Sequence, residues 1–193
     1  YNEKGTLQGA AVYLNNTMLG TTTNEKGEFT LPVKPGNYNL IVSYLGYKTI
    51  NYQLNTEEYS KPLVFALEED NQILDEIIIK KTVYDDEWRN NLQVFKNEFL
   101  GTSELAQGCE ILNEEVIGFE YDRKEDKLVA FARKPLEIKH KKLGYLITFD
   151  LESFERYKNQ VTYLGYTRYT QLKGGKRKQK RWKENRRIAY NGS

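Results

Sequence analysis

Apolar and polar residues alternate in short segments over the first 67 residues of the chain. In residues 37–45 every second side chain is apolar or aromatic, a period of two that is typical of a strand: Tyr38, Leu40, Val42 and Tyr44. Similar short segments, separated by turn residues such as Asn15-Asn16 and Pro35-Gly36, occupy residues 10–14, 17–23, 28–33, 47–54 and 63–67. Regularly spaced short strands of this kind predict an antiparallel β-sandwich.

A helical period appears after residue 83. Four apolar residues, Trp88, Leu92, Phe95 and Phe99, recur every three or four positions and predict one buried helix face. Asp85 can cap this helix and Gly101 can end it. Alternation then returns at 117–121, 128–133, 145–151 and 161–172, and helix-forming residues fill 176–190. Residues 83–193 are therefore predicted to form a helix, a β-meander and a second helix.

The predicted fold class is mainly β with an α+β second part. The 193 residues suit one large domain or two small ones. We expect a sandwich over residues 1–67, an acidic and β-branched connector over 68–82, and an α+β domain of unknown function over 83–193.

Glycines at turns and aromatic residues at core positions share a fixed register in the first segment. They include Gly9-Ala10, Gly20, Gly27, Phe29, Gly36, Tyr38 and Leu45-Gly46-Tyr47. This pattern resembles the carboxypeptidase-like regulatory domain, a transthyretin-like β-sandwich. The resemblance implies a docking or spacer module that hydrolyses nothing itself. The strand that opens the family pattern is missing before Tyr1, so we expect it upstream, or expect another segment to complete the sheet edge.

Two further resemblances concern the rest of the chain. The segment Leu74-Asp75-Glu76-Ile77-Ile78-Ile79 resembles the TonB-contacting region of outer-membrane receptors from Bacteroidetes-type bacteria. This implies a partner-binding strand that adds to a sheet edge, with an ordinary strand as the alternative. Residues such as Cys109, Leu143-Gly144-Tyr145 and Trp182 resemble the uncharacterised C-terminal region that follows the regulatory domain in many Bacteroidetes proteins. That resemblance implies a location in the cell envelope.

The net charge of +2 conceals a strongly basic segment near the end of the sequence. Residues 173–187 hold nine Lys and Arg against one acid, so the remainder of the chain is net acidic. This segment is a candidate anion-contacting helix, formed by Lys176, Arg177, Lys178, Lys180, Arg181, Trp182, Arg186 and Arg187. Anionic lipid headgroups or an acidic protein would suit it, and a solvated, salt-bridged helix is the alternative. No nucleic-acid motif accompanies it, so no nucleic-acid partner is expected.

Candidate catalytic chemistry is sparse. Cys109 and His140 are the only residues of their kinds, which excludes an intrachain disulfide and a thiolate zinc site. Glu137 and His140 form the spacing Glu-x-x-His, but their neighbours indicate a strand, where these two positions face opposite sides. We therefore expect no catalytic residue, metal or cofactor, and we interpret Cys109 as a small core residue.

These observations predict a non-enzymatic docking protein of the cell envelope, an accessory component of an outer-membrane β-barrel protein complex. We expect export to the periplasm or the outer membrane, protein partners in that membrane, and no transmembrane segment, since no apolar run approaches ~20 residues. One alternative is a glycan-binding module that uses some of the 15 tyrosines. A second alternative is an unrecognised hydrolase built on Glu137 and His140.

Overall fold

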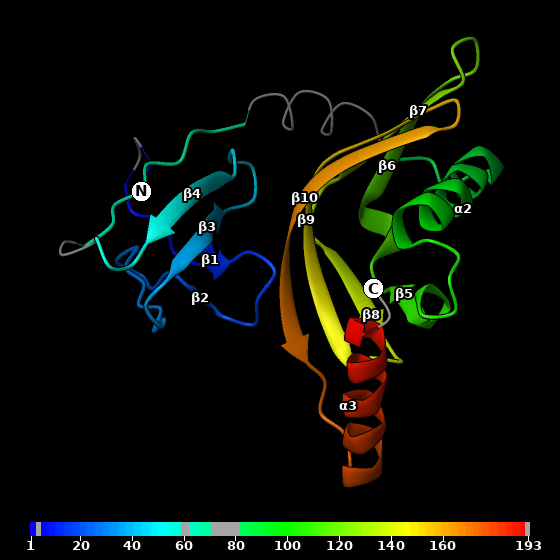
Figure 1. Cartoon of the computed structure of the whole chain (residues 1–193). Helices are drawn as coiled ribbons and strands as arrows, with labels where there is room; N and C mark the ends of the chain where they lie inside the picture. Colours follow the sequence, from blue (N-terminus) through cyan, green and yellow to red (C-terminus); the bar gives the residue numbers. More distant parts are fainter. Residues whose placement is uncertain (3–4, 59–61, 71–81, 192–193) are drawn as a thin grey trace. The chain divides into compact units, whose positions relative to one another are not determined.

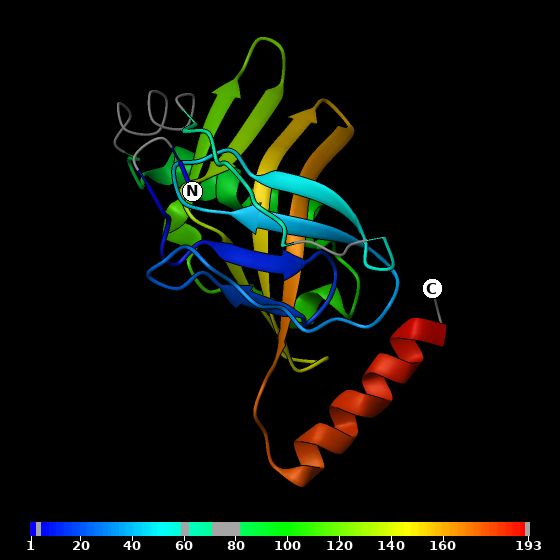
Figure 2. The same ribbon diagram turned by 90° about the vertical axis from the view of Figure 1, so that its left-hand side faces the viewer.

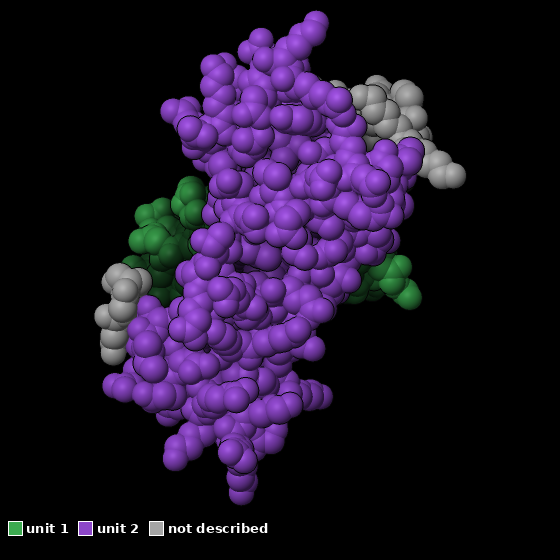
Figure 3. Space-filling view, turned by 90° about the vertical axis from the view of Figure 1, so that its right-hand side faces the viewer, with its two compact units in different colours: residues 1–81 green, residues 82–193 purple. Residues whose placement is uncertain are grey.

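The computed structural model describes residues 1–2, 5–58, 62–70 and 82–191 of the chain. It divides the protein into two compact units, Tyr1–Lys81 and Thr82–Ser193, which Figure 3 colours separately. The predicted second domain starts at residue 83, next to this division. The described residues contain two sheets and two α-helices, and the fold is mainly β, as the sequence pattern predicts.

The first unit is built on a four-stranded antiparallel sheet (Figure 1). The strands follow the order β2-β1-β3-β4, with bounds β1 (Ala11–Leu14), β2 (Gly20–Thr22), β3 (Asn37–Ser43) and β4 (Ile50–Asn55). Val12 of β1 lies opposite Val42 of β3, so the apolar positions of the two strands share one face. That face carries the buried cluster of Val12, Leu14, Leu40, Val42, Leu54 and Leu67.

The predicted strands at 28–33 and 63–67 are not strands in the structure. Their apolar side chains nevertheless pack against the buried cluster, through Phe29, Leu31, Val33, Leu63 and Phe65. Pro32 has no backbone N–H to donate to a ladder, which disfavours a paired strand at the first segment. The prediction was therefore correct for side-chain packing, whereas neither segment forms a strand.

The second unit contains a six-stranded antiparallel sheet whose central strand is β9. Its elements in chain order are α2 (Asp86–Leu100), η1 (Ala106–Gly108), β5 (Cys109–Ile111), η2 (Glu114–Val116), β6 (Ile117–Asp122), β7 (Lys127–Ala132), β8 (Leu136–His140), β9 (Tyr145–Tyr157), β10 (Gln160–Gln171) and α3 (Lys176–Asn191). β8 pairs with the first residues of β9 and β7 with the last ones, while β10 pairs along almost the whole strand. β9 and β10 therefore form a long ribbon that joins two smaller groups of strands (Figure 1).

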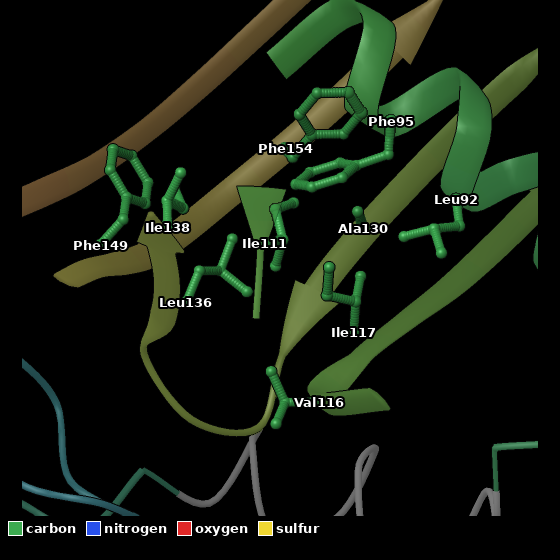
Figure 4. Packing of buried hydrophobic residues seen from close by; sticks show 10 residues of the cluster. All are labelled: Leu92, Phe95, Ile111, Val116, Ile117, Ala130, Leu136, Ile138, Phe149 and Phe154. Atoms are coloured by element: carbon green, nitrogen blue, oxygen red, sulfur yellow. The ribbon is translucent and has the colours of Figure 1, made fainter. Parts of the chain in front are cut away.

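Helix α2 follows the predicted signals closely. Asp85 accepts a hydrogen bond from the backbone N–H of Trp88 at 2.8 Å, and Gly101 ends the helix with a φ of 82°. Leu92 and Phe95 are buried on its inner face. Figure 4 shows these side chains directed at apolar residues of the sheet, such as Phe154, and the ring centroids of Phe95 and Phe154 lie 4.7 Å apart.

Gly144 and Gly165 are among the glycines of this unit that permit the close approach of an aromatic ring. A Cβ atom at Gly165 would overlap the ring of Phe149 and the backbone oxygen of Asp150. Gly165 lies at the point where the register between β9 and β10 shifts, so this bulge seats the Phe149 ring. At Gly144, where φ is 71°, a Cβ would overlap the indole of Trp182. Helix α3 can therefore lie against the backbone at this turn.

Candidate docking sites

The residues considered for catalysis do not form a site. Glu137 is exposed on β8, whereas His140 is buried at the end of the same strand. Strand geometry turns their side chains to opposite faces of the sheet. Among the described residues no group of three or more His, Cys, Asp or Glu side chains is arranged to hold a metal ion.

The structure does place Cys109 directly opposite His140, across the ladder between β5 and β8. This juxtaposition could not be predicted from the sequence pattern, because the two residues lie far apart in the chain. Burial raises the pKa of the Cys109 thiol, and burial also lowers the pKa of His140. Both shifts favour the neutral forms, which is the opposite of an activated thiolate–imidazolium pair. Cys109 packs against the core of the second unit, as predicted.

An open groove of about 430 Å³ lies in the first unit, between residues 26–29 and 62–67. Apolar side chains form most of its lining, including Leu7, Phe29, Val42, Leu63 and Phe65. The rings of Phe29 and Phe65 stack with centroids 6.4 Å apart. Val64, with 73% of its surface exposed, stands at the edge of the groove.

At one end of this groove, the backbone of Tyr1 is hydrogen-bonded to the backbone of residues 65–67. Its amino group donates to the carbonyl of Phe65 at 3.1 Å, and its carbonyl accepts from the N–H of Leu67 at 2.9 Å. This is the pattern of a parallel pair centred on Ala66. Within the part of the chain that the structure describes, the N–H of Phe65 and the carbonyl of Leu63 have no backbone partner.

The candidate partner-binding strand, Leu74 to Ile79, lies outside the described residues. The start of the predicted connector is described and belongs to the first unit. Lys48 N–H donates to Glu68 at 2.9 Å, and Asp70 N–H donates to Gly46 at 2.9 Å.

The middle of helix α3 is held on the turn between β8 and β9. Trp182 is 6% exposed, and its indole N–H donates to the carbonyl of Lys141 at 3.0 Å. Asn185 donates to the carbonyl of Lys142 at 2.7 Å and Arg186 to that of Leu143 at 2.8 Å. The guanidinium of Arg186 also lies 4.0 Å from the ring centre of Tyr145.

Two of the eight predicted anion-contacting residues therefore point inward, because Trp182 and Arg186 anchor the helix. The remaining six are exposed, namely Lys176, Arg177, Lys178, Lys180, Arg181 and Arg187. Arg187 is paired with Glu184 at 2.8 Å. The other five make no ion pair or hydrogen bond with any side chain that the structure describes.

A second hollow of about 560 Å³ lies between α3, the residues 104–105 that precede η1, and the turn at 141–142. Lys141 and Lys142 line it but are paired with Glu110 at 2.7 Å and Glu104 at 2.9 Å, and these contacts hold the pKa of both carboxyls below the ordinary value. Arg181 lines the same hollow without such a partner among the described residues. The exposed apolar side chains of Leu105 and Ile188 complete one side.

The glycan-binding alternative stays a prediction. Five of the described tyrosines are more than a third exposed, namely Tyr1, Tyr84, Tyr121, Tyr163 and Tyr190. Tyr121 also donates to Asp126 at 2.9 Å. Several other tyrosines, among them Tyr38, Tyr44 and Tyr52, pack against the core of the first unit.

Among the described residues, no helix is long and apolar enough to cross a bilayer.

One of three comparisons with known proteins found a match, and this match lies in the first unit. Searches of curated proteins and of solved structures found no match to the chain. A comparison with protein families matched residues 1–79 to the family described as CarboxypepD_reg-like domain.

The matched region covers the four-stranded sheet, its buried cluster and the groove. Its turn glycines and core aromatics are those on which the sequence resemblance rests. The first unit is therefore similar, over residues 1–79, to the CarboxypepD_reg-like domain, a β-sandwich without catalytic function.

Proposed function

We propose that the protein is a non-enzymatic docking subunit of the cell envelope, an accessory component of an outer-membrane β-barrel protein complex. In this proposal the first unit binds an extended segment of a partner protein. The observation that carries the proposal is the apolar groove beside Tyr1. Export to the periplasm or the outer membrane is part of the same proposal, and the resemblances of the connector and of the second half support it.

The groove supports this function through two features that act together. Its floor contains apolar and aromatic side chains, and burial of their surface would contribute most of the affinity. Its rim contains the peptide groups of Leu63 and Phe65, which would add directional hydrogen bonds. A strand with apolar residues at alternate positions satisfies both, because one face would enter the groove while the backbone pairs with the rim.

Site-specific photocrosslinking in native envelopes tests the proposal. A photoreactive residue at position 64 would replace Val64 at the rim of the groove, and a matched probe would replace Met18. Met18 is also exposed, at 58%, and belongs to the same unit but does not line the groove. We expect the probe at position 64 to form an adduct with an outer-membrane protein, identified by mass spectrometry, and the probe at position 18 to form none.

Two results would contradict the proposal. Equal adducts from both positions would indicate unspecific contact with the envelope. A crosslink from position 64 only to the protein's own chain would indicate that the groove is filled from within.

A further inference from the structure

The cations of helix α3 are arranged against the rules that stabilise an isolated helix. Negative side chains near the first turn and positive ones near the last turn favour a helix, because its backbone dipole is positive at the N-terminal end. Helix α2 follows this arrangement, with Asp86 and Glu87 in its first turn. Helix α3 has no acid in its first turn and no base in its last turn.

Like charges also repel one another along the surface of α3. Residues 176–183 contain six Lys and Arg and no acid. Lys176 and Lys180 are four positions apart, as are Arg177 and Arg181, which places each pair on neighbouring turns. The first acid in the helix, Glu184, is already engaged with Arg187. The helix therefore retains a concentrated positive charge that its described neighbours do not neutralise.

The anchoring of the helix determines which face presents this charge. Trp182, Asn185 and Arg186 bind the turn at 141–144, so the opposite side of α3 faces away from the unit. Figure 2 shows α3 beyond the end of the sheet where β10 finishes, rather than across a face of the sheet. At 100° per residue, Lys176, Arg177 and Lys180 fall on the side opposite Trp182. A flat anionic surface can reach all three together.

We infer that this exposed face of α3 binds anionic phospholipid headgroups at a membrane surface. A cluster of Lys and Arg next to a bilayer is attracted by the negative potential of acidic lipids within about one Debye length. The hollow beside the helix fits the same ligand class, because it combines Arg181, which has no ion-pair partner among the described residues, with the exposed apolar side chains of Leu105 and Ile188. A phosphate would pair with Arg181, and the adjoining apolar portion of a lipid would contact Leu105 and Ile188.

Nucleic acid fits this surface less well. Proteins that bind single strands combine cations with aromatic rings on which bases stack. Trp182 is buried and bonded to Lys141, so its ring is not available for stacking. Tyr190 is exposed, but it lies at the other end of the helix from Lys176, Arg177 and Lys180.

Vesicle co-sedimentation of the whole chain tests the inference. We expect binding to phosphatidylcholine vesicles that contain phosphatidylglycerol, and we expect that binding to fall as the NaCl concentration rises. The triple variant Lys176→Gln, Arg177→Gln, Lys180→Gln should bind at least tenfold more weakly. The matched control Arg123→Gln, Lys124→Gln, Lys134→Gln removes the same charge from exposed positions of the same unit and should bind like the original protein.

Far-ultraviolet circular dichroism and a tryptophan emission spectrum unchanged from the original protein would confirm that the triple variant keeps α3 folded and anchored. Equal binding to neutral vesicles, unchanged binding of the triple variant, or absence of binding to acidic vesicles would each overturn the inference. Retention on double-stranded DNA without binding to acidic vesicles would assign the surface to nucleic acid instead. The outcome is independent of the proposed function, because the groove belongs to the other unit and the crosslinking experiment does not involve α3.

Discussion

At the scale of single residues, Gly144 shows how one missing methyl group can determine where a helix lies. Its backbone has a φ of 71°, and the indole of Trp182 covers it. Gly174 lies close to the same indole, so Trp182 sits between two glycines. This arrangement accounts for a buried tryptophan in a helix whose other side chains are mostly exposed.

We predict that Gly144→Ala will detach α3 from its turn. The added Cβ must displace the indole, and the left-handed backbone is strained for alanine, so the unfolding free energy should fall by about 2 kcal/mol. Urea unfolding and a red shift of tryptophan emission would measure this change. Gly175→Ser is the matched control, because a Cβ at Gly175 meets no atom within 4 Å and serine suits the residue preceding a helix. Equal loss of stability in both variants would contradict the packing role of Gly144.

We predict a pH dependence of stability that originates at His140. Burial lowers its folded-state pKa below 6.5, and Lys142 lowers it further. Protonation therefore favours the unfolded chain: the stability is complete above pH 6.5 and declines as the pH falls from there through the folded-state pKa. His140→Gln keeps an acceptor for the N–H of Leu143, which lies 3.4 Å from the imidazole Nδ1, but cannot titrate.

Denaturant unfolding at pH 7.5 and pH 5.5 should show a smaller loss of stability in His140→Gln than in the original chain. The interpretation is direct because the sequence contains one histidine. Parallel losses in the two proteins would show that His140 does not carry the effect.

At the scale of elements, helix α2 provides a comparison between two neighbouring acids. Asp85 caps the helix, whereas Asp86 forms an exposed ion pair with Arg89. We predict that Asp85→Ala lowers the unfolding free energy by about 1 kcal/mol, because the N–H of Trp88 loses its acceptor. Asp86→Ala removes the same charge from the same turn and should cost less than about 0.5 kcal/mol. Urea unfolding followed by tryptophan emission would separate the two, and equal losses would mean that charge, rather than the cap, stabilises α2.

Sequence patterns predicted an element well where the residues of that element alone determine its backbone conformation. Helix α2 needed only its apolar stripe, the cap at Asp85 and the stop at Gly101. The segments 28–33 and 63–67 show the limit, because alternation reports which side chains are buried and does not report whether the backbone has a neighbour to pair with. Their apolar residues do pack on the core, but neither segment forms a strand.

The candidate sites also contain features that the sequence could predict and features that it could not. The basic character of α3 is visible in the composition, so its outward cations could be predicted. The inward direction of Trp182 and Arg186 depends on the turn at 141–144, which meets α3 only after folding. The groove could not be predicted either, since residues 26–29 and 62–67 come together only in the folded unit.

At the scale of the whole molecule, the two units have separate sheets and separate cores. We predict that they unfold in two transitions rather than one. Both tryptophans, Trp88 and Trp182, belong to the second unit, so tryptophan emission reports on that unit alone. Calorimetry and amide NMR signals of β1 and β3 would report on the first unit. A single transition that coincides for all probes would contradict the prediction.

The long pairing between β9 and β10 has a consequence for the order of folding. The two strands are joined by a short turn after Tyr157, so their ladder closes between residues that are near in sequence. Local contacts of this kind form faster than distant ones, because little chain entropy is lost in bringing them together. β7 and β8 each pair with a different end of β9. β5, which begins at residue 109, pairs with β8 across a larger separation in sequence. We expect the hairpin to act as a template that forms early and sets the register for the strands that join it later.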